Sequence, residues 1–241
     1  MATEEDKPRE SLWERLERPS PTPRQTLSPQ RIAAAAAAVA DAEGLEAITM
    51  RRLASELGVA PMAPYRYVAG KDDVLELMVD HVYADLRLPD GLGWRETMRA
   101  LALGTRDLML RHLWLAQLSP QARLSLTPNR MAVAEQALSA LDGLGLDADA
   151  MMSVFRAVDA YVAGALNYES AVLNLLREHG WSDGGELRSE LAPQMTWHMR
   201  TGRYPTFQRY LRTATRKDDT RWQFESGLTY VLDGIAAELG I

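Results

Sequence analysis

Apolar residues recur at helical spacing along most of the chain. From Trp94 onward they fall three or four positions apart, and no alternating apolar–polar run is long enough to predict a strand. We therefore expect an all-α protein. Between the breaks marked by proline, glycine and polar runs, the pattern predicts helices at about 94–111, 113–118, 128–143, 148–178, 187–201 and 220–239.

The first 27 residues interrupt this pattern with mixed charges and four prolines. We expect a disordered tail there, with at most a transient helical turn or two at residues 11–18. Arg15, Arg18 and Arg24 are candidate contacts of a basic arm on DNA, but neighbouring glutamates dilute their charge, so a plain solvated tail is favoured. A second break, the loop Asp90-Gly91-Leu92-Gly93, indicates a domain boundary. These breaks divide the chain into residues 1–27, 28–90 and 91–241.

The first strong helix signal follows the tail. Ser28-Pro29 is typical of an N-cap followed by proline in the first turn, and the helix is expected to end near Gly44. Residues 33–38 are six consecutive alanines, a composition that favours helix. Their small side chains would allow neighbouring helices to approach closely.

Residues 49–71 predict two short helices joined by a glycine turn. Thr49 is a good N-cap, and Leu53 and Ala54 share one apolar face behind it. Gly58 can adopt the left-handed backbone that ends a helix, and Pro61 suits the start of the next one. This arrangement is a helix-turn-helix, whose second helix enters the major groove of DNA.

This stretch resembles the DNA-binding domain of the TetR family of bacterial transcription regulators. The resemblance runs from Ser28 to about Asp85. The helical remainder looks like the ligand-binding domain of the tetracycline-repressor branch. The residues that carry the resemblance are Ile48-Thr49, Arg51, Leu53-Ala54, Leu57-Gly58-Val59, Tyr65 and Lys71.

Positive charge in the first turn of a helix is unfavourable because of the helix dipole, and it costs about 0.3–1 kcal/mol for each of Arg51 and Arg52. A DNA phosphate or guanine edge is therefore the natural partner of at least one of them. The resemblance implies that Arg51 reaches a base and that Tyr65 and Lys71 clamp the phosphate backbone. Met62 is apolar and suits a thymine methyl group. The remaining candidate DNA contacts are Thr49, Pro61, Ala63, Arg66 and Tyr67.

Pro64 departs from the family pattern, in which an ordinary apolar residue occupies this position. A proline removes one backbone hydrogen bond unless the helix begins just before it. The recognition helix is therefore expected to be short or kinked.

Composition changes this picture little. The net charge is −6, yet residues 24–71 carry six basic and four acidic side chains, and screening confines the field of the acidic remainder to about 10 Å. The absence of cysteine excludes disulfides, thiolate metal sites and cysteine nucleophiles. No apolar run predicts a signal peptide or a membrane span, so a cytoplasmic protein is expected.

Several apolar and polar side chains of the C-terminal region are candidates for a ligand pocket. Tetracycline repressors hold a magnesium–drug chelate with a histidine and an acidic residue. Here Ser119-Pro-Gln-Ala-Arg offers no histidine, and Asn167 occupies the acidic position. We therefore expect no metal or cofactor, and a small apolar or aromatic inducer other than tetracycline. The candidate contacts are Met109, His112, Trp114, Phe155, Asp159, Asn167 and Trp197.

The resemblance also implies a homodimer through the helices at about 148–178 and 220–239. The last helix carries a wide apolar stripe, which suggests a partner beyond its own domain. A twofold dimer would match a palindromic operator of double-stranded DNA. The stripe comprises Trp222, Leu228, Val231, Leu232, Ile235 and Leu239.

The favoured function is therefore a ligand-responsive repressor released from its operator by the inducer. A helical enzyme is the first alternative, but the four histidines lack metal spacing and no Ser-His-Asp arrangement or phosphate-binding loop is present. A DNA binder without ligand control is the second. The length of the helical region argues against it, because DNA binding and dimerisation need less chain. Repression and activation are not separable from sequence.

Overall fold

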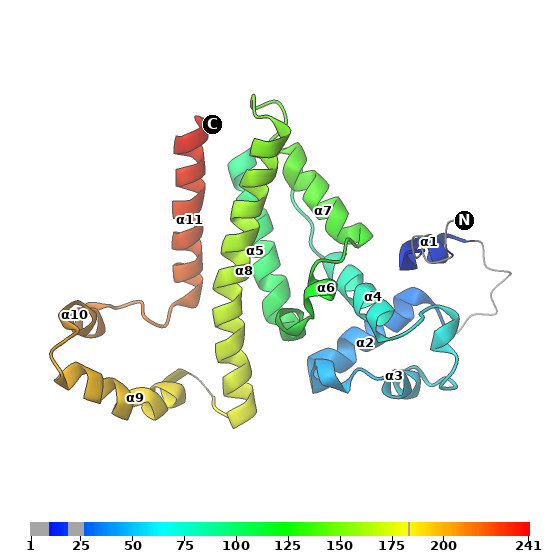
Figure 1. Ribbon diagram of the computed structural model, residues 1–241, viewed down its shortest axis with the longest axis horizontal. Coiled ribbons are helices and arrows are strands. Elements are labelled where there is room, and N and C mark those ends of the chain that lie inside the picture. The colour runs from blue at the N-terminus through cyan, green and yellow to red at the C-terminus, as the bar shows by residue number, and fades with distance from the viewer. Residues whose placement is uncertain (1–9, 19–26, 183) are drawn as a thin grey trace, which may run out of the picture. The chain divides into compact units, whose positions relative to one another are not determined.

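The computed structural model describes residues 10–18, 27–182 and 184–241 (Figure 1). Every regular element within these residues is an α-helix or a 3-10 helix, which confirms the all-α fold class. No helix in the described part of the chain combines the length and apolar character needed to cross a membrane. The chain divides into two compact units, and each is considered by itself. One contains the residues up to Arg87 with Gln117–Ala132, and the other contains Leu88–Ala116 with Val133–Ile241.

The first unit is built on α2 (Pro29–Glu43) and α4 (Lys71–Tyr83), which pack along each other. The predicted start of α2 is confirmed: Ser28 Oγ accepts a hydrogen bond of 3.2 Å from the Arg31 amide, and Pro29 occupies the first turn. Small buried side chains on α2 allow α4 to lie close to it. These are Ala33, Ala36, Ala37 and Ala40.

Helix α1 (Leu12–Glu17) replaces the disorder expected at this point of the chain. Ser11 and Glu14 form a reciprocal capping box, and Leu12 is buried. Arg15 is ion-paired with Asp73 of α4. A six-residue helix is marginal alone. The capping box and the contacts with the rest of the unit stabilise this helix, although the composition of the tail does not favour a folded segment.

The remaining tail residues, 1–9 and 19–26, lie outside the described residues. The candidate arm residue Arg24 is one of them. Of the two other candidate arm residues, Arg15 is engaged by Asp73 and Arg18 by Glu10. Neither side chain is available as an unpaired cation in this structure.

Residues 117–132 also belong to the first unit, although the predicted boundary at residue 90 placed them in the second domain. This segment contains α6 (Pro120–Arg123) and the beginning of α7 (Pro128–Ser139). Arg130 donates hydrogen bonds to the carbonyls of Arg123 and Ser125 at 2.8 and 2.9 Å. Its guanidinium carbon lies 5.3 Å from the Tyr83 ring centroid. Such contacts leave no periodic signal in a sequence, which explains why the boundary did not anticipate them.

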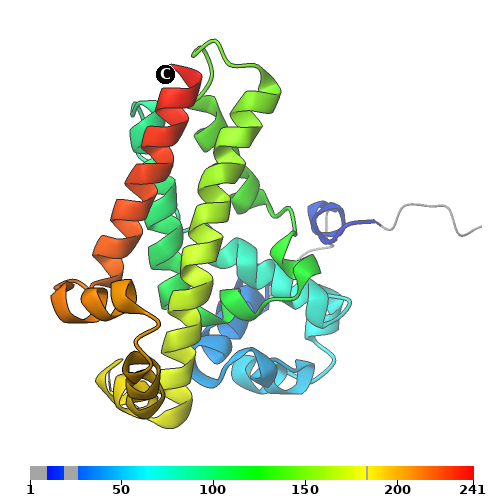
Figure 2. The same ribbon diagram turned by 60° about the vertical axis from the view of Figure 1, so that its left-hand side comes forward.

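The core of the second unit lies between α5 (Trp94–Arg111), α8 (Ala148–His179) and α11 (Thr220–Leu239), which run side by side (Figures 1 and 2). The bounds of all three agree with the predicted helices to within one residue. Fully buried side chains from each helix fill the space between them. They include Met98, Leu108, Val158, Leu166, Leu228 and Leu232.

The apolar stripe of the last helix is only partly a surface feature. Leu228 and Leu232 are 0% exposed within this single chain, so they belong to the core of their own unit rather than to a partner contact. Trp222 is 43% exposed and Leu239 36% exposed. The stripe was wide because it combines an inward face with an outward one.

Other helix predictions need correction. The segment expected to be a helix at 113–118 is a 3-10 helix, Leu113–Gln117, and α7 ends at Ser139 instead of 143. Helix α9 begins at Gly184, three residues earlier than expected. Helix α10 (Pro205–Thr213) was missed, as was α6. Both begin with a proline, which marks either a break or a first helical turn.

Helices α9 and α10 carry no buried residue among their described positions. They continue from the end of α8 as the yellow and orange segment of Figure 1. Large apolar side chains are therefore solvent-exposed on these helices and on the link between them. These include Leu191, Trp197, Tyr204, Phe207 and Tyr210.

Candidate nucleic-acid interface

Helix α3 (Met50–Leu57) begins and ends as the sequence predicts. Thr49 Oγ1 accepts a hydrogen bond of 3.1 Å from the Arg52 amide, which satisfies one free donor of the first turn. Gly58 has φ 66° and ψ 34°, the left-handed conformation that terminates the helix. Leu53 and Ala54 are buried, so the opposite face of α3 points to solvent.

The segment after Gly58 is shorter than a regular recognition helix. The Ala63 amide donates to the Ala60 carbonyl at 2.9 Å, and a single 3-10 turn, Pro64–Arg66, follows. The expectation of a short or kinked helix is thus confirmed. Pro61 and Pro64 both lack the amide hydrogen that continued α-helix would use. Pro64 is buried, and the Tyr67 and Val68 amides donate to its carbonyl.

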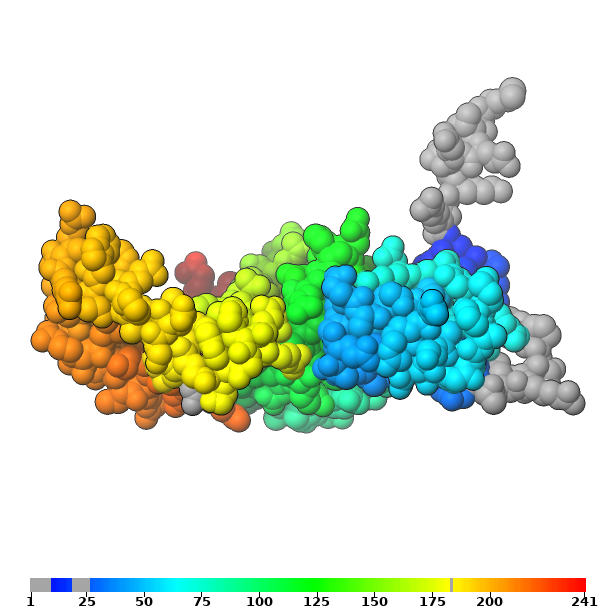
Figure 3. Space-filling view, turned by 90° about the horizontal axis from the view of Figure 1, so that it is seen from below, coloured from blue at the N-terminus to red at the C-terminus, as the bar shows by residue number. Residues whose placement is uncertain are grey.

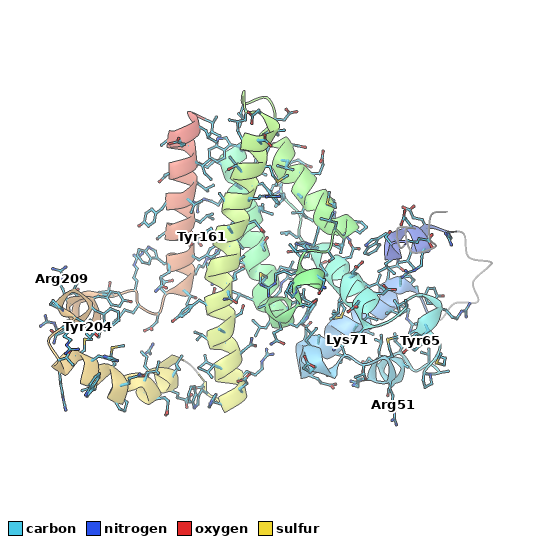
Figure 4. All side chains as sticks on the ribbon, in the orientation of Figure 1. Arg51, Tyr65, Lys71, Tyr161, Tyr204 and Arg209 are labelled. Atoms are coloured by element: carbon cyan, nitrogen blue, oxygen red, sulfur yellow. The ribbon has the colours of Figure 1, made fainter. Side chains whose placement is uncertain are left out.

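Three cations on this surface have no partner. No hydrogen bond or ion pair within the described residues involves the side chains of Arg51, Arg66 or Lys71, and all three are exposed. Figure 4 shows Arg51 pointing away from α3. Figure 3 views the first unit from the α3 side, where α3 and the following turn form one exposed surface. Unpaired, exposed guanidinium and ammonium groups can bind phosphate or base edges.

Exposed apolar and aromatic groups lie in the same short segment. Met62 is 70% exposed and Tyr65 is 43% exposed, and Pro61 is exposed beside them. Ala63 is half-buried. DNA bound at this surface would cover the exposed Met62 side chain.

Arg52 has a different role from Arg51. Its guanidinium forms ion pairs with Glu43 of α2 at 2.7 Å and with Glu56 of α3 at 2.8 Å. These hydrogen bonds raise the pKa of Arg52, and the Arg52 hydrogen bond lowers the pKa of Glu43. Arg52 therefore joins the end of α2 to α3. Of the two neighbouring arginines, Arg51 is the one presented to solvent without a partner.

Tyr67 is likewise engaged within the unit. Its hydroxyl donates a 3.0 Å hydrogen bond to the Leu27 carbonyl, and the side chain is half-buried. The Tyr67 hydroxyl proton is therefore used within the unit, and the DNA contact of Tyr67 stays a prediction. Tyr65 remains as the exposed tyrosine of the pair.

The beginning of α4 completes this surface. Gly70 precedes the helix without a side-chain cap, and Asp73 Oδ2 instead accepts a 2.7 Å hydrogen bond from the Ala69 amide. Asp72 and Asp73 complement the helix dipole in the first turn. Lys71 belongs to the same turn and is exposed.

The seven predicted ligand contacts occupy different environments in the second unit. Trp114 is only 2% exposed, and its ring centroid lies 5.9 Å from that of His112. Met109 and Phe155 are half-buried, whereas Asp159 and Asn167 are exposed on α8. Trp197 is 63% exposed on α9, with its ring 4.9 Å from that of His198. The structure joins His112 to Trp114 and does not give the seven a common environment.

The second unit contains a buried ion pair that the sequence did not predict. Arg106 of α5 donates a 2.6 Å hydrogen bond to Glu169 of α8, and both side chains are largely buried. Arg106 also lies 5.5 Å from the Phe224 ring centroid of α11, and its buried Nε has no partner among the described residues. A charged residue within the apolar face of α5 was the only available signal. The pair joins three helices, at a desolvation cost that the packing of the second unit must offset.

A second contact holds α8 to α11. The Tyr161 hydroxyl donates a 2.6 Å hydrogen bond to the Phe224 carbonyl, and burial raises the pKa of Tyr161. A Cβ added at Gly227 would meet the Tyr161 hydroxyl and two of its ring carbons, the carbons at 3.0 Å. A side chain at position 227 would therefore require the end of the Tyr161 side chain to shift.

Comparison with known proteins places both units in one family. Residues 32–78 match the model of bacterial regulatory proteins, tetR family, and residues 88–239 match the tetracyclin repressor-like C-terminal domain. The HTH-type transcriptional repressor DrrR1 of Streptomyces coeruleorubidus is 36% identical over 229 residues, which cover 94% of this chain and 83% of that protein.

Two solved structures are similar in fold and in sequence. The Streptomyces coelicolor TetR family protein ActR, in complex with actinorhodin, has a TM-score of 0.72 at 25% identity, covering 88% of this chain and 96% of that one. BioQ in complex with its double-stranded DNA operator has a TM-score of 0.60 at 25% identity, covering 88% and 99%.

Proposed function

The chain belongs to the tetR family of bacterial regulatory proteins, and we propose that it is a repressor that leaves a palindromic operator when it binds a small apolar or aromatic molecule. Family membership makes it a DNA-binding transcription regulator and not an enzyme. The observation that carries the proposal is the trio of exposed, unpaired cations, Arg51, Arg66 and Lys71, around the α3 turn.

Each group at this surface has a role suited to its chemistry. Arg51 reads a guanine edge in the major groove, since its fork can donate two hydrogen bonds to O6 and N7. Met62 and Pro61 contact thymine methyl groups. Tyr65 and Lys71 bind phosphates and fix the register without reading sequence. The short 3-10 turn limits base reading to a few side chains, which places most of the specificity on Arg51 and Arg66.

A homodimer through α8 and α11 supplies the second copy of this surface. Gly164 of α8 and Gly234 of α11 lie inside helices, where glycine costs about 0.5–1 kcal/mol relative to alanine. A Cβ at either position would meet nothing within 4 Å in this chain. Close approach of a partner helix accounts for glycine at both positions. Tyr168 and Tyr230, exposed by 73% and 71%, then become buried between the two copies.

Ligand control rests on the second unit. ActR was solved in complex with actinorhodin, so a protein of similar fold binds a small molecule. In this chain the His112–Trp114 pair and the half-buried Met109 and Phe155 supply aromatic and flexible apolar groups. A ligand that favours the DNA-free state can lower operator affinity by its differential binding, typically about 5–150-fold.

Selection of binding sites from a random library of DNA duplexes tests the proposal. The purified chain should enrich a palindrome whose half-sites are centred about one helical turn apart, or a multiple of it, with two chains bound per site. A protein that enriches no sequence, or binds a single asymmetric half-site as a monomer, would contradict it.

A further inference from the structure

A cavity of about 520 Å³ lies in the first unit, away from the α3 surface. It is bounded by α1, the beginning of α2, the second half of α4, and Pro128 at the start of α7. Figures 1 and 2 place α1 and α3 at opposite ends of this unit. Cavities of about 300–1,000 Å³ are the size that holds small organic ligands.

The walls of the cavity are mainly apolar, with an aromatic group on one side. Trp13 and Leu16 of α1 face it from the N-terminal helix, and Ala33, Leu77 and Ala84 line it from α2 and α4. Trp13 is half-buried, so its indole is shielded yet accessible from the cavity. An indole face attracts cations as well as apolar groups.

The charged side chains at the cavity are acidic. Glu17 and Asp80 line it together with His81, and no lysine or arginine is among the lining residues. Neither carboxylate belongs to an ion pair within the described residues. Among the described residues, the side-chain oxygens of Asp80 accept hydrogen bonds from the neutral Asn129.

Three basic side chains of α1, its C-cap and α7 are engaged elsewhere. Arg15 of α1 pairs with Asp73, Arg18 pairs with Glu10, and Arg130 donates to backbone carbonyls. The cavity therefore combines an aromatic wall with two carboxylates that form no ion pair with the described residues.

We propose that this cavity binds an amphipathic organic cation with an aromatic or apolar body. The apolar body would lie against Leu16, Leu77 and Ala84, and the cationic group would lie between the Trp13 ring and the Glu17 carboxylate. This is a second ligand site, in the DNA-binding unit, and it is independent of the inducer site proposed for the second unit. It stands or fails regardless of whether that inducer exists.

Two isosteric ions of opposite charge test the proposal. The full-length protein is titrated calorimetrically with tetraphenylphosphonium and with tetraphenylborate. We expect the cation to bind saturably at one site per chain and the anion to bind at least about tenfold more weakly. The carboxylates of the cavity attract the cation and repel the anion. Absence of cation binding, or equal binding of the two ions, overturns the proposal.

Substitutions in the lining locate the site. Trp13→Ala should weaken binding of the cation about 5–30-fold, and Glu17→Gln about 2–5-fold. Ala84→Leu fills the cavity from α4 without altering α1, so it should abolish saturable binding even if Trp13→Ala loosens the helix. Glu46→Gln is the matched control, since Glu46 is an exposed glutamate of the same unit that does not line the cavity.

Binding of the cation that survives both Trp13→Ala and Ala84→Leu would place the cation elsewhere and overturn the assignment. Operator binding of the same variants is measured in parallel. Because none of the substituted residues lies on the α3 surface, DNA affinity without the cation should stay within about twofold of the unsubstituted protein, which separates this test from that of the proposed function.

Discussion

Asp80 and Asn129 are joined by three hydrogen bonds. The Asn129 amide donates to Asp80 Oδ1 at 2.7 Å, and Asn129 Nδ2 donates to Asp80 Oδ2 at 2.8 Å and to the Asp80 carbonyl at 3.1 Å. Asp80 is in α4, and Asn129 is in the first turn of α7. Within the first unit, this contact attaches the returning segment 117–132 to α4, whose first turn carries Lys71 of the proposed DNA-binding surface.

Loss of the Asn129 side chain should weaken that attachment. Asn129→Ala removes two of the three hydrogen bonds and leaves part-buried oxygens of Asp80 with fewer partners, so we expect a loss of about 1–3 kcal/mol in the free energy of unfolding of the first unit. Asn129→Asp should cost more, because it places a second carboxylate against Asp80. Urea unfolding followed by circular dichroism measures both. Equal stability of all three proteins would show that the contact does not hold the segment in place.

A side chain at Gly227 should destabilise the second unit while Tyr161 is present. Gly227→Ala places a methyl group against the tyrosine hydroxyl and ring, and overpacking of this kind typically costs about 1–3 kcal/mol. The double variant with Tyr161→Phe removes the hydroxyl and should recover part of that loss. Thermal unfolding of the two single variants and the double variant tests the coupling. Purely additive losses would contradict the close approach of the ring to α11.

A charge placed on the outward face of α8 and a charge placed on the inward face of α11 should have different effects. Ala160 is exposed on α8, and Ala160→Arg should give folded monomers, because the arginine blocks close approach of the partner helix without disturbing the chain's own core. Leu232→Arg should instead unfold the second unit, since Leu232 is 0% exposed within one chain and an unpaired buried charge costs several kcal/mol.

Sedimentation velocity with circular dichroism distinguishes these outcomes, and Ser139→Arg, at an exposed position of α7, serves as the control. A dimer unchanged by Ala160→Arg would remove this face of α8 from the interface.

The sequence predicts features that depend on near neighbours better than those that depend on distant ones. The caps at Ser28 and Thr49 and the turn at Gly58 follow from local backbone chemistry, and they are confirmed. Long periodic helices such as α8 and α11 also have nearly the expected bounds. The all-α fold and the family follow from these features.

Contacts between distant residues were not predictable in the same way. Whether Arg51 or Arg52 is unpaired depends on Glu43, which lies on another helix. The inward position of Leu232 depends on how α11 packs. An apolar stripe on a helix does not by itself show whether the same chain or a partner covers it. The Arg106–Glu169 pair links residues 63 positions apart. Each is a property of tertiary packing rather than of local pattern.

An inducer of the proposed kind must bind more weakly when operator is present. By thermodynamic reciprocity, the factor by which the ligand lowers operator affinity equals the factor by which operator lowers ligand affinity, expected at about 5–150-fold. Compounds found by thermal-shift screening are titrated with and without saturating operator. Identical affinities in the two titrations would exclude that compound as an inducer.

Operator binding by Arg51→Ala, Arg52→Ala and Lys71→Ala over a range of salt concentrations tests the central claim most directly. We predict that Arg51→Ala loses about 1–3 kcal/mol on the selected operator and little on unrelated DNA. Lys71→Ala should weaken binding to all sequences and reduce the salt slope by about one. Arg52→Ala should change operator affinity less than Arg51→Ala, because its guanidinium already pairs with Glu43 and Glu56. If Arg51→Ala and Lys71→Ala bind the operator as tightly as the unsubstituted protein at about 0.15 M salt, the α3 surface is not the DNA-binding face.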